Sequence, residues 1–159
     1  MIKCTMKSIA AAAFSGTLVF SSLAARAADD GIVKVRSTYS MEETVARLKQ
    51  DVAAKGIMFF SEVDQSALAA KAGITIRPSM LLTFGNPPLG TQFIAAKPEA
   101  GLDWPVRLLV QQNDKGEVWA VYTDFGWIAR RHGIAGEAAK PFQTASGVIA
   151  SITSSIKPN

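Results

Sequence analysis

The chain carries few residues that could perform acid–base chemistry, and its single histidine is the most informative of them. His132 closes the basic run Arg130–Arg131–His132. An imidazole can act as a general base or a metal ligand, and Asp103 is the carboxylate that would pair with it as acid and base. Each residue also has a structural explanation: a cation complements the dipole at a helix C-terminus, and an aspartate before Trp104–Pro105 stabilises a turn. We favour the structural explanation and keep the acid–base pair as an alternative.

The residue patterns needed for metal, cofactor or nucleophilic chemistry do not occur in the sequence. A zinc site needs three or four histidine, cysteine or carboxylate ligands, and no such spacing surrounds the one histidine. The chain has no Gly-x-Ser-x-Gly nucleophile motif and no glycine-rich phosphate loop, and its only cysteine is Cys4. We therefore expect no metal site and no cofactor, and the sequence favours a protein that is not an enzyme.

The best candidate for a binding site is the turn that ends an apolar strand. The stretch 78–84 is apolar and strand-like, and Gly85–Asn86–Pro87–Pro88 ends it abruptly. Glycine permits positive φ and Pro87 restricts Asn86 to an extended conformation, so we expect unusual dihedrals at Gly85 that exclude a side chain. An ordinary strand end would explain the same residues. The candidate ligand-binding residues are Phe84, Gly85, Asn86, Pro87, Asp103, Arg131 and His132.

Residues 1–27 have the pattern of a cleaved signal peptide. Lys3 and Lys7 precede an apolar run, and Ala25–Arg26–Ala27 places small residues at the two positions that a signal peptidase reads. We expect cleavage before Ala28, a periplasmic or secreted protein, and no membrane attachment afterwards. Of 17 basic and 13 acidic residues, three basic ones leave with this segment, so the remaining charge is about +1. Nucleic-acid binding needs a dense basic surface and is therefore disfavoured.

The remaining residues, 28–159, predict a single α+β domain. Ser40 and Glu43 form a capping box that starts an amphipathic helix. The other expected elements are strands at 32–37, 57–63 (Ile57, Phe59 and Val63 on one face), 78–84, 106–111 and 117–123, a short helix within 88–97 (Phe93 and Ile94 inward), a helix after Asp124, and a last helix with Phe142, Ala145, Ile149, Ile152 and Ile156 inward. Because helices and strands do not alternate regularly, we expect a mostly antiparallel sheet with helices packed on one face.

Several of these segments together resemble the domain of unknown function 302 family. The resemblance rests on Pro78, Leu81–Leu82, Phe84–Gly85–Asn86–Pro87, the turn Gly101–Leu102–Asp103–Trp104–Pro105, Trp119 and Tyr122, and Arg130–Arg131–His132. It covers Tyr39 to Ile134, with a C-terminal helix expected at 137–156. It implies a TATA-binding-protein-like fold that is usually dimeric, with no established activity. Family members often carry Asp-His where this chain has Asp64–Gln65, so any role of that histidine is in doubt here.

The sequence thus predicts an exported, non-catalytic domain that binds a small ligand or a protein partner, and that forms a homodimer. One alternative is a metal-free enzyme that uses Asp103 and His132. The other is a purely structural homodimer, held by the aromatic residues of the C-terminal third. Those residues are Trp104, Trp119, Tyr122, Phe125 and Trp127.

Overall fold

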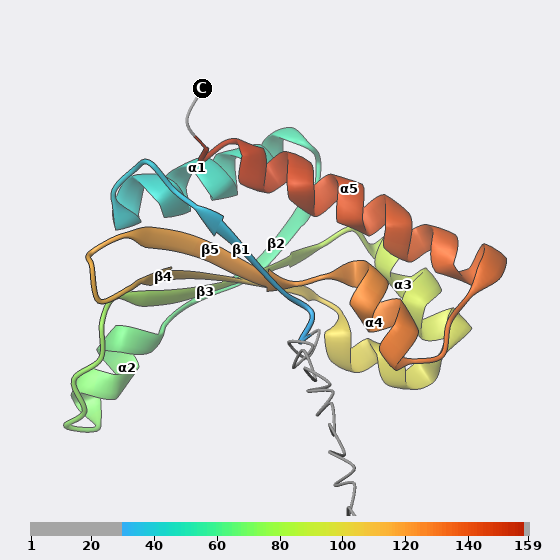
Figure 1. Cartoon of the computed structure of the whole chain (residues 1–159), viewed down its shortest axis with the longest axis horizontal. Coiled ribbons are helices and arrows are strands. Elements are labelled where there is room, and N and C mark those ends of the chain that lie inside the picture. Colours follow the sequence, from blue (N-terminus) through green and yellow to red (C-terminus); the bar gives the residue numbers. More distant parts are fainter. Residues whose placement is uncertain (1–29, 158–159) are drawn as a thin grey trace, which may run out of the picture.

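Five antiparallel strands form one sheet in a computed structural model that describes residues 30–157 (Figure 1). The expected signal peptide and its cleavage site lie outside the described residues. The strands are β1 (Ile32–Arg36), β2 (Met58–Asp64), β3 (Ser79–Gly85), β4 (Val106–Gln112) and β5 (Val118–Thr123), in the order β1-β5-β4-β3-β2. The helices are α1 (Met41–Ala54), α2 (Gln65–Lys71), α3 (Pro87–Ala96), η1 (Pro98–Asp103), α4 (Phe125–Arg131), η2 (Gly136–Ala139) and α5 (Lys140–Ser154). The expected α+β class is confirmed.

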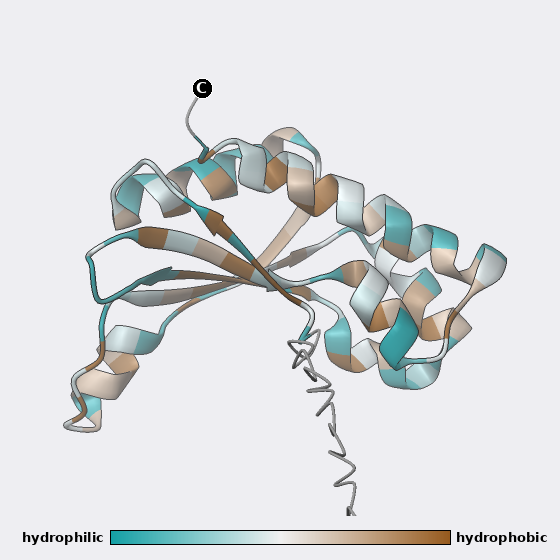
Figure 2. Ribbon diagram, in the orientation of Figure 1, coloured by the Kyte–Doolittle hydropathy of each residue, from teal (hydrophilic) through white to brown (hydrophobic). Residues whose placement is uncertain are grey.

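Helices α1 and α5 cover one face of the sheet, and the hydrophobic core lies between these helices and the sheet (Figure 1). Alternate strand residues point to that face, as the pairing of Leu82 with Leu108 illustrates, and both are at most 1% exposed. Every residue of the expected C-terminal apolar stripe is buried, four of them in α5 and Ile156 just after it, which confirms the 3.6-residue period seen in the sequence. Figure 2 shows the same division as hydrophobic bands on the strands and on the helices above them.

Side-chain caps fix where helices α1, α2, α3 and α4 begin. The Ser40 hydroxyl accepts a hydrogen bond from the Glu43 amide at 3.2 Å, as the capping box requires. The Glu43 carboxylate does not reach back to Ser40 and instead pairs with Arg47 at 2.9 Å. Asp124 caps α4 by accepting from the Trp127 amide at 2.7 Å. The Asp124 cap thus fixes the start of α4 directly after β5.

Two details of the expected side-chain orientations are wrong. Ile57, Phe59 and Val63 were expected on one face of the strand, but a register shift between Phe59 and Ser61 interrupts the alternation along β2. Phe59 pairs with the buried Phe84, whereas Val63 pairs with Leu81, the neighbour of the buried Leu82, so Val63 lies on the opposite face. Ile94 was expected inward with its neighbour and is 37% exposed. Consecutive helical residues point about 100° apart, so the buried Phe93 turns Ile94 toward solvent.

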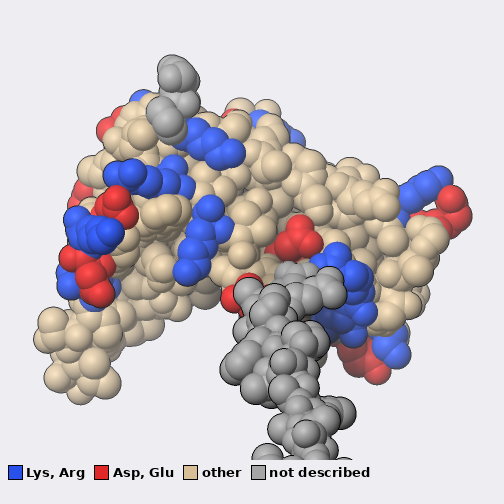
Figure 3. Space-filling view, in the orientation of Figure 1, with Lys and Arg blue, Asp and Glu red and all other residues tan. Residues whose placement is uncertain are grey.

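One segment projects from the molecule on the other side of the sheet. Helix α2 and the residues that follow it extend away from the body at the lower left of Figure 1. Figure 3 shows this projection as a surface without charged side chains in the same view, whereas Lys, Arg, Asp and Glu gather above it. Within residues 30–157, none of the helices is both long enough and apolar enough to cross a membrane.

Candidate functional site

The candidate residues separate into a polar group and an apolar group that meet at two consecutive residues. Helix η1 ends at Asp103, and β4 begins at Val106. The side chain of Asp103 turns toward the end of α4, whereas the indole of Trp104 lies against the start of α3. The chain between η1 and β4 therefore contributes to two different environments.

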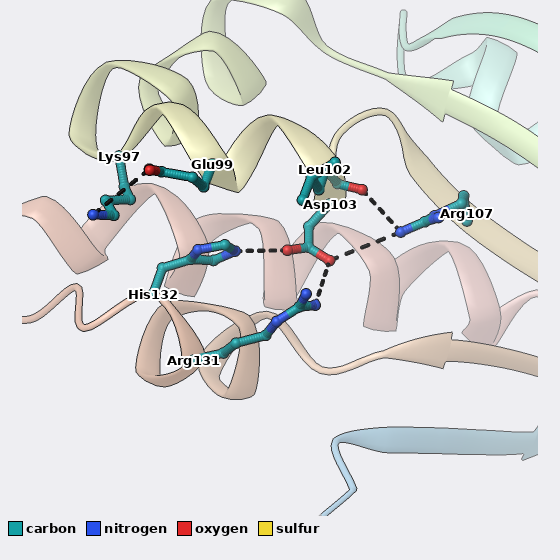
Figure 4. Close-up of polar contacts among 7 residues, drawn as sticks. All are labelled: Lys97, Glu99, Leu102, Asp103, Arg107, Arg131 and His132. Carbon is teal, nitrogen blue, oxygen red and sulfur yellow. Dashed lines mark hydrogen bonds and ion pairs between the residues drawn. The ribbon is translucent and has the colours of Figure 1, made fainter.

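The polar group is a buried Asp–His pair with two arginines at its rim (Figure 4). His132 Nε2 lies 2.7 Å from Asp103 Oδ2, and the two side chains are 7% and 5% exposed. Arg131 Nη1 and Arg107 Nη2 lie 3.3 Å and 3.8 Å from Asp103 Oδ1. Since a carboxylate only accepts hydrogen bonds, Nε2 of the imidazole donates to it.

The local chain path explains why these residues meet. His132 is the C-cap of α4, and its amide bonds to the Ile128 carbonyl at 3.1 Å. Gly133 follows with φ 68°, a conformation that glycine adopts without strain, and it turns the chain away. Our interpretation of His132 as a residue at a helix C-terminus is correct in position but incomplete, because its ring is buried against Asp103. Asp103 likewise does more than stabilise a turn.

The space beside the Asp–His pair limits its chemistry. The Asp103 carboxylate orients the His132 imidazole, which is the arrangement of an acid–base dyad. The adjoining space has a volume of about 20 Å³, which is room for one water molecule. The contacts as they stand join η1 to α4, and both carboxylate oxygens of Asp103 are already engaged.

The apolar group is built around Trp104. Its indole lies over Gly85 and Gly90, and a methyl group at Gly90 would overlap the indole ring. A methyl group at Gly85 would lie 2.8 Å from Nε1. The expected unusual dihedrals at Gly85 are wrong, since its φ is not positive. Glycine is required there because the Trp104 ring occupies the place of a side chain.

A small apolar cavity lies beneath this indole. Its volume is about 30 Å³. The lining residues are Ile57, Phe84, Gly85, Asn86, Leu89, Gly90, Phe93, Trp104, Val106, Phe125, Ala145, Val148, Ile149 and Ile152. Asn86 is the one polar side chain among them. Its amide oxygen accepts from the Leu89 amide at 3.4 Å, so it also caps α3, of which Pro87 is the first residue.

The seven candidate residues therefore do not form one site. Phe84, Gly85 and Asn86 line the cavity, whereas Asp103, Arg131 and His132 form the polar group, and Pro87 belongs to neither. Val106 and Phe125 line both spaces and lie between them. The sequence leaves open whether the turn lies near Arg131 and His132; the turn lines the cavity and these two residues do not.

Three residues of the cavity region were missed as site residues. Trp104 was noted only as one of several aromatic residues, and Gly90 was not singled out. Phe60 meets the Trp104 ring edge-on, with ring centroids 6.0 Å apart, and is 41% exposed. A signal existed for Gly90: a glycine inside a helix is unfavourable by about 1 kcal/mol relative to alanine, so it often marks close packing.

The remaining aromatic residues serve mostly within the chain. Phe125 is buried in the core, and the Trp127 ring lies against Gly31, whose missing side chain leaves room for it. Trp119 and Tyr122 are half-buried. Burial raises the pKa of the Tyr122 hydroxyl. Of the five aromatic residues expected at a dimer surface only Phe125 is fully buried, and the homodimer stays a prediction.

Asp64 and Gln65, at the family's Asp-His position, have structural partners. The Ser66 hydroxyl and the Ala67 amide bond to the Asp64 carboxylate and lower its pKa. The Gln65 amide oxygen accepts from the Ser79 hydroxyl at 2.8 Å. Together they fix the start of α2 against β3.

The fold and the cavity define a class: an α+β domain with one antiparallel sheet and a small apolar site at the sheet's end. The chain belongs to the family described as Domain of unknown function DUF302, whose model matches residues 33–152. This range extends beyond the expected 39–134 at both ends. A solved structure of an uncharacterized conserved DUF302 protein from Bacillus stearothermophilus has the same fold, with a TM-score of 0.73 and 15% identity over 80% of this chain and 99% of that one.

Longer relatives carry a channel name. The chain is 36% identical over 124 residues to proteins named Fluoride-specific ion channel FluC 1 from Brucella suis biovar 1 (strain 1330) and Brucella abortus biovar 1 (strain 9-941). The match covers 76% of this chain and 49% and 46% of those proteins. The chain therefore spans about half the length of the curated relatives it matches.

Proposed function

We propose that this protein is an exported, non-catalytic binding domain, and that its site is the cavity beneath Trp104. The observation that carries the proposal is a half-exposed indole lying over a buried apolar floor that includes Phe84, Phe93 and Ile149. Such a floor is free of polar groups that a ligand would have to satisfy. Largely apolar walls with few polar groups are typical of small-molecule sites.

The size of the cavity defines the ligand and the motion that admits it. A volume of about 30 Å³ holds about one water molecule, so a ligand enters only when the indole moves. Because Gly85 and Gly90 lack side chains, the space that the ring vacates is open to another ring. The ligand class is a small aromatic or branched aliphatic molecule with at most one polar group, which Asn86 would meet.

The proposal is tested by thermal unfolding with indole and cyclohexanol as probes. Val148 is half-buried and lines the cavity, so Val148→Trp should fill the site with little effect on the core. Ile94→Trp is the matched control, since Ile94 is exposed and does not line the cavity. Both probes should raise the midpoint of the wild type and of the control, but not that of Val148→Trp. If neither probe raises the wild-type midpoint, the proposed site is wrong.

An acid–base enzyme is the second candidate, and the 2.7 Å contact between His132 and Asp103 favours it. Its weakness is the engaged carboxylate and the lack of space for a substrate. A panel of ester, amide and lactone substrates should distinguish the two candidates. If the pair is catalytic, the wild type turns over one of them and His132→Gln does so at least about a hundredfold more slowly. If the domain is non-catalytic, as we propose, the wild type and His132→Gln do not differ in their rate on any substrate of the panel.

The channel-named relatives support a cellular setting for the domain. This chain matches only about half the length of those relatives. We infer that the part of those relatives matched by this chain lies outside the membrane, and that this chain acts beside a membrane protein that moves fluoride. Deletion of its gene should then lower the fluoride tolerance of the host. Unchanged tolerance would remove this setting and leave the cavity proposal intact.

Export is tested separately. The pattern of residues 1–27 supports cleavage before Ala28 and a periplasmic or secreted protein. Intact mass of the protein purified from an exporting host should correspond to a chain that begins at Ala28. A mass that includes residues 1–27 would contradict it.

A further inference from the structure

The segment that projects from the sheet exposes apolar side chains that its own chain covers only in part. We call residues 65–78, which are α2 and the loop to β3, the α2 arm. No residue of α2 is buried, and Leu68, Ile74 and Ile76 are 53%, 57% and 45% exposed. A seven-residue helix is too short to be stable without packing. The arm therefore has the properties of a segment that packs against another molecule.

A groove of complementary character adjoins the arm. It lies between α1 and β2 and has a volume of about 600 Å³. We call it the α1–β2 groove; its lining residues are Met41, Glu42, Val45, Ala46, Lys49, Glu62, Asp64, Ser66, Pro78, Ser79 and Met80. Met41, Val45 and Met80 give it an apolar floor. The charged residues at its sides are three acidic and one basic.

We propose that two copies of this chain associate by exchanging their α2 arms, each arm packing in the α1–β2 groove of the other copy. The charges agree with this arrangement: the arm carries Lys71 and Arg77 and no acidic residue, whereas the groove is acidic in balance. Arg77 pairs with Asp114, and Glu62 with Lys49, within one chain, so Lys71 and Glu42 are the charges that the contact between copies would add. The isoleucines of the arm would meet the apolar floor. Opposite charges at the rim favour this docking over other orientations.

The position of the groove identifies the occupant as a second copy. Ser66 and Pro78, at the two ends of the arm, also line the groove. Arm and groove are therefore adjacent on one molecule, as a two-fold symmetric contact requires, in which each copy gives and receives the same surface. The arm has fourteen residues and the groove adds nine others, which is within the roughly 20 to 30 residues a side of a stable interface. The association is independent of the cavity beneath Trp104.

The first test measures the oligomeric state of the full chain, purified from an exporting host, by light scattering and sedimentation at micromolar concentration. Ile74→Glu with Ile76→Glu changes only exposed positions and should raise the dimer dissociation constant at least about tenfold. Ile94→Glu with Leu102→Glu is the matched control at exposed apolar positions outside the arm, and it should stay dimeric. A monomeric wild type, or a dimer that tolerates the arm substitutions, overturns the proposal.

The second test identifies the contact directly. With Cys4 replaced by serine the chain has no cysteine, so single cysteines can be introduced. Chains with Ile74→Cys, mixed with chains with Met41→Cys, should form a disulfide between copies on mild oxidation. Leu102→Cys mixed with Met41→Cys should not. A dimer in which the control pair forms the cross-link and the arm pair does not uses another surface, and the proposal is then wrong.

Discussion

Gly90→Ala should displace Trp104 and destabilise the protein through that one contact. The added methyl group overlaps the indole ring, so the ring must leave its position. Exposing about half of an indole, roughly 100 Å², costs about 2.5 kcal/mol at about 25 cal/mol per Å². Alanine is better than glycine inside a helix by about 1 kcal/mol, which offsets part of this. The free energy of unfolding should therefore fall by about 1.5 kcal/mol.

The effect should change sign when the ring is absent. In the Trp104→Ala background the methyl group at position 90 meets no indole, and only the helix propensity remains. Gly90→Ala should then raise the free energy of unfolding by about 1 kcal/mol. The difference between the two backgrounds, about 2.5 kcal/mol, is the coupling between the residues.

Urea unfolding followed by far-UV circular dichroism measures all four proteins without relying on tryptophan emission. Gly147→Ala is the control, because this exposed glycine of α5 has no atoms within 4 Å of an added methyl group. It should stabilise both backgrounds equally, by about 1 kcal/mol. If Gly90→Ala destabilises both backgrounds to the same extent, the contact with Trp104 is not the reason for the glycine.

Three further predictions concern stability. Asn86→Ala should lower the free energy of unfolding by about 1 kcal/mol through the lost cap of α3, as measured by urea unfolding. Asp103→Asn should lower it by about 2 kcal/mol, whereas Arg131→Ala, at the exposed rim, should change it by less than about 1 kcal/mol; equal effects would contradict the buried pair. Hydrogen bonding from Ser66 lowers the pKa of Asp64, so its ionised form stabilises the fold above the ordinary value of 3.8, and this contribution is lost as pH falls through the lowered folded-state pKa. Asp64→Asn should therefore flatten the acid limb of the stability profile, and an unchanged limb would refute the assignment.

The elements of the fold could be predicted because they are encoded locally. The Ser40 cap and the apolar stripe of the last helix each depend on residues a few positions apart, and both occur, although the reciprocal Glu43 half of the capping box does not. The errors concern which face of a strand or helix single residues take. The register shift in β2 moves Val63 to the face opposite Phe59, and Ile94 is exposed because its neighbour Phe93 takes the buried face of α3.

The site could be predicted only in part, because its contacts join distant segments. The sequence suggested that Asp103 and His132 could form a pair, and they do meet across 29 positions. It placed them with Asn86, whereas the side chains of Asp103 and Trp104 point to separate environments. The residues around Gly90 do not indicate which ring lies over it. That contact depends on the path of the chain after η1, which brings Trp104 against α3.

Nuclear magnetic resonance of the indole N–H groups tests the central claim most directly. The described chain has three tryptophans, Trp104, Trp119 and Trp127, so its spectrum should contain three such signals that single Trp→Phe variants assign. Titration with indole or cyclohexanol should move the Trp104 signal in a saturable manner and leave the other two in place. No movement of the Trp104 signal, or equal movement of all three, would contradict a binding site beneath Trp104.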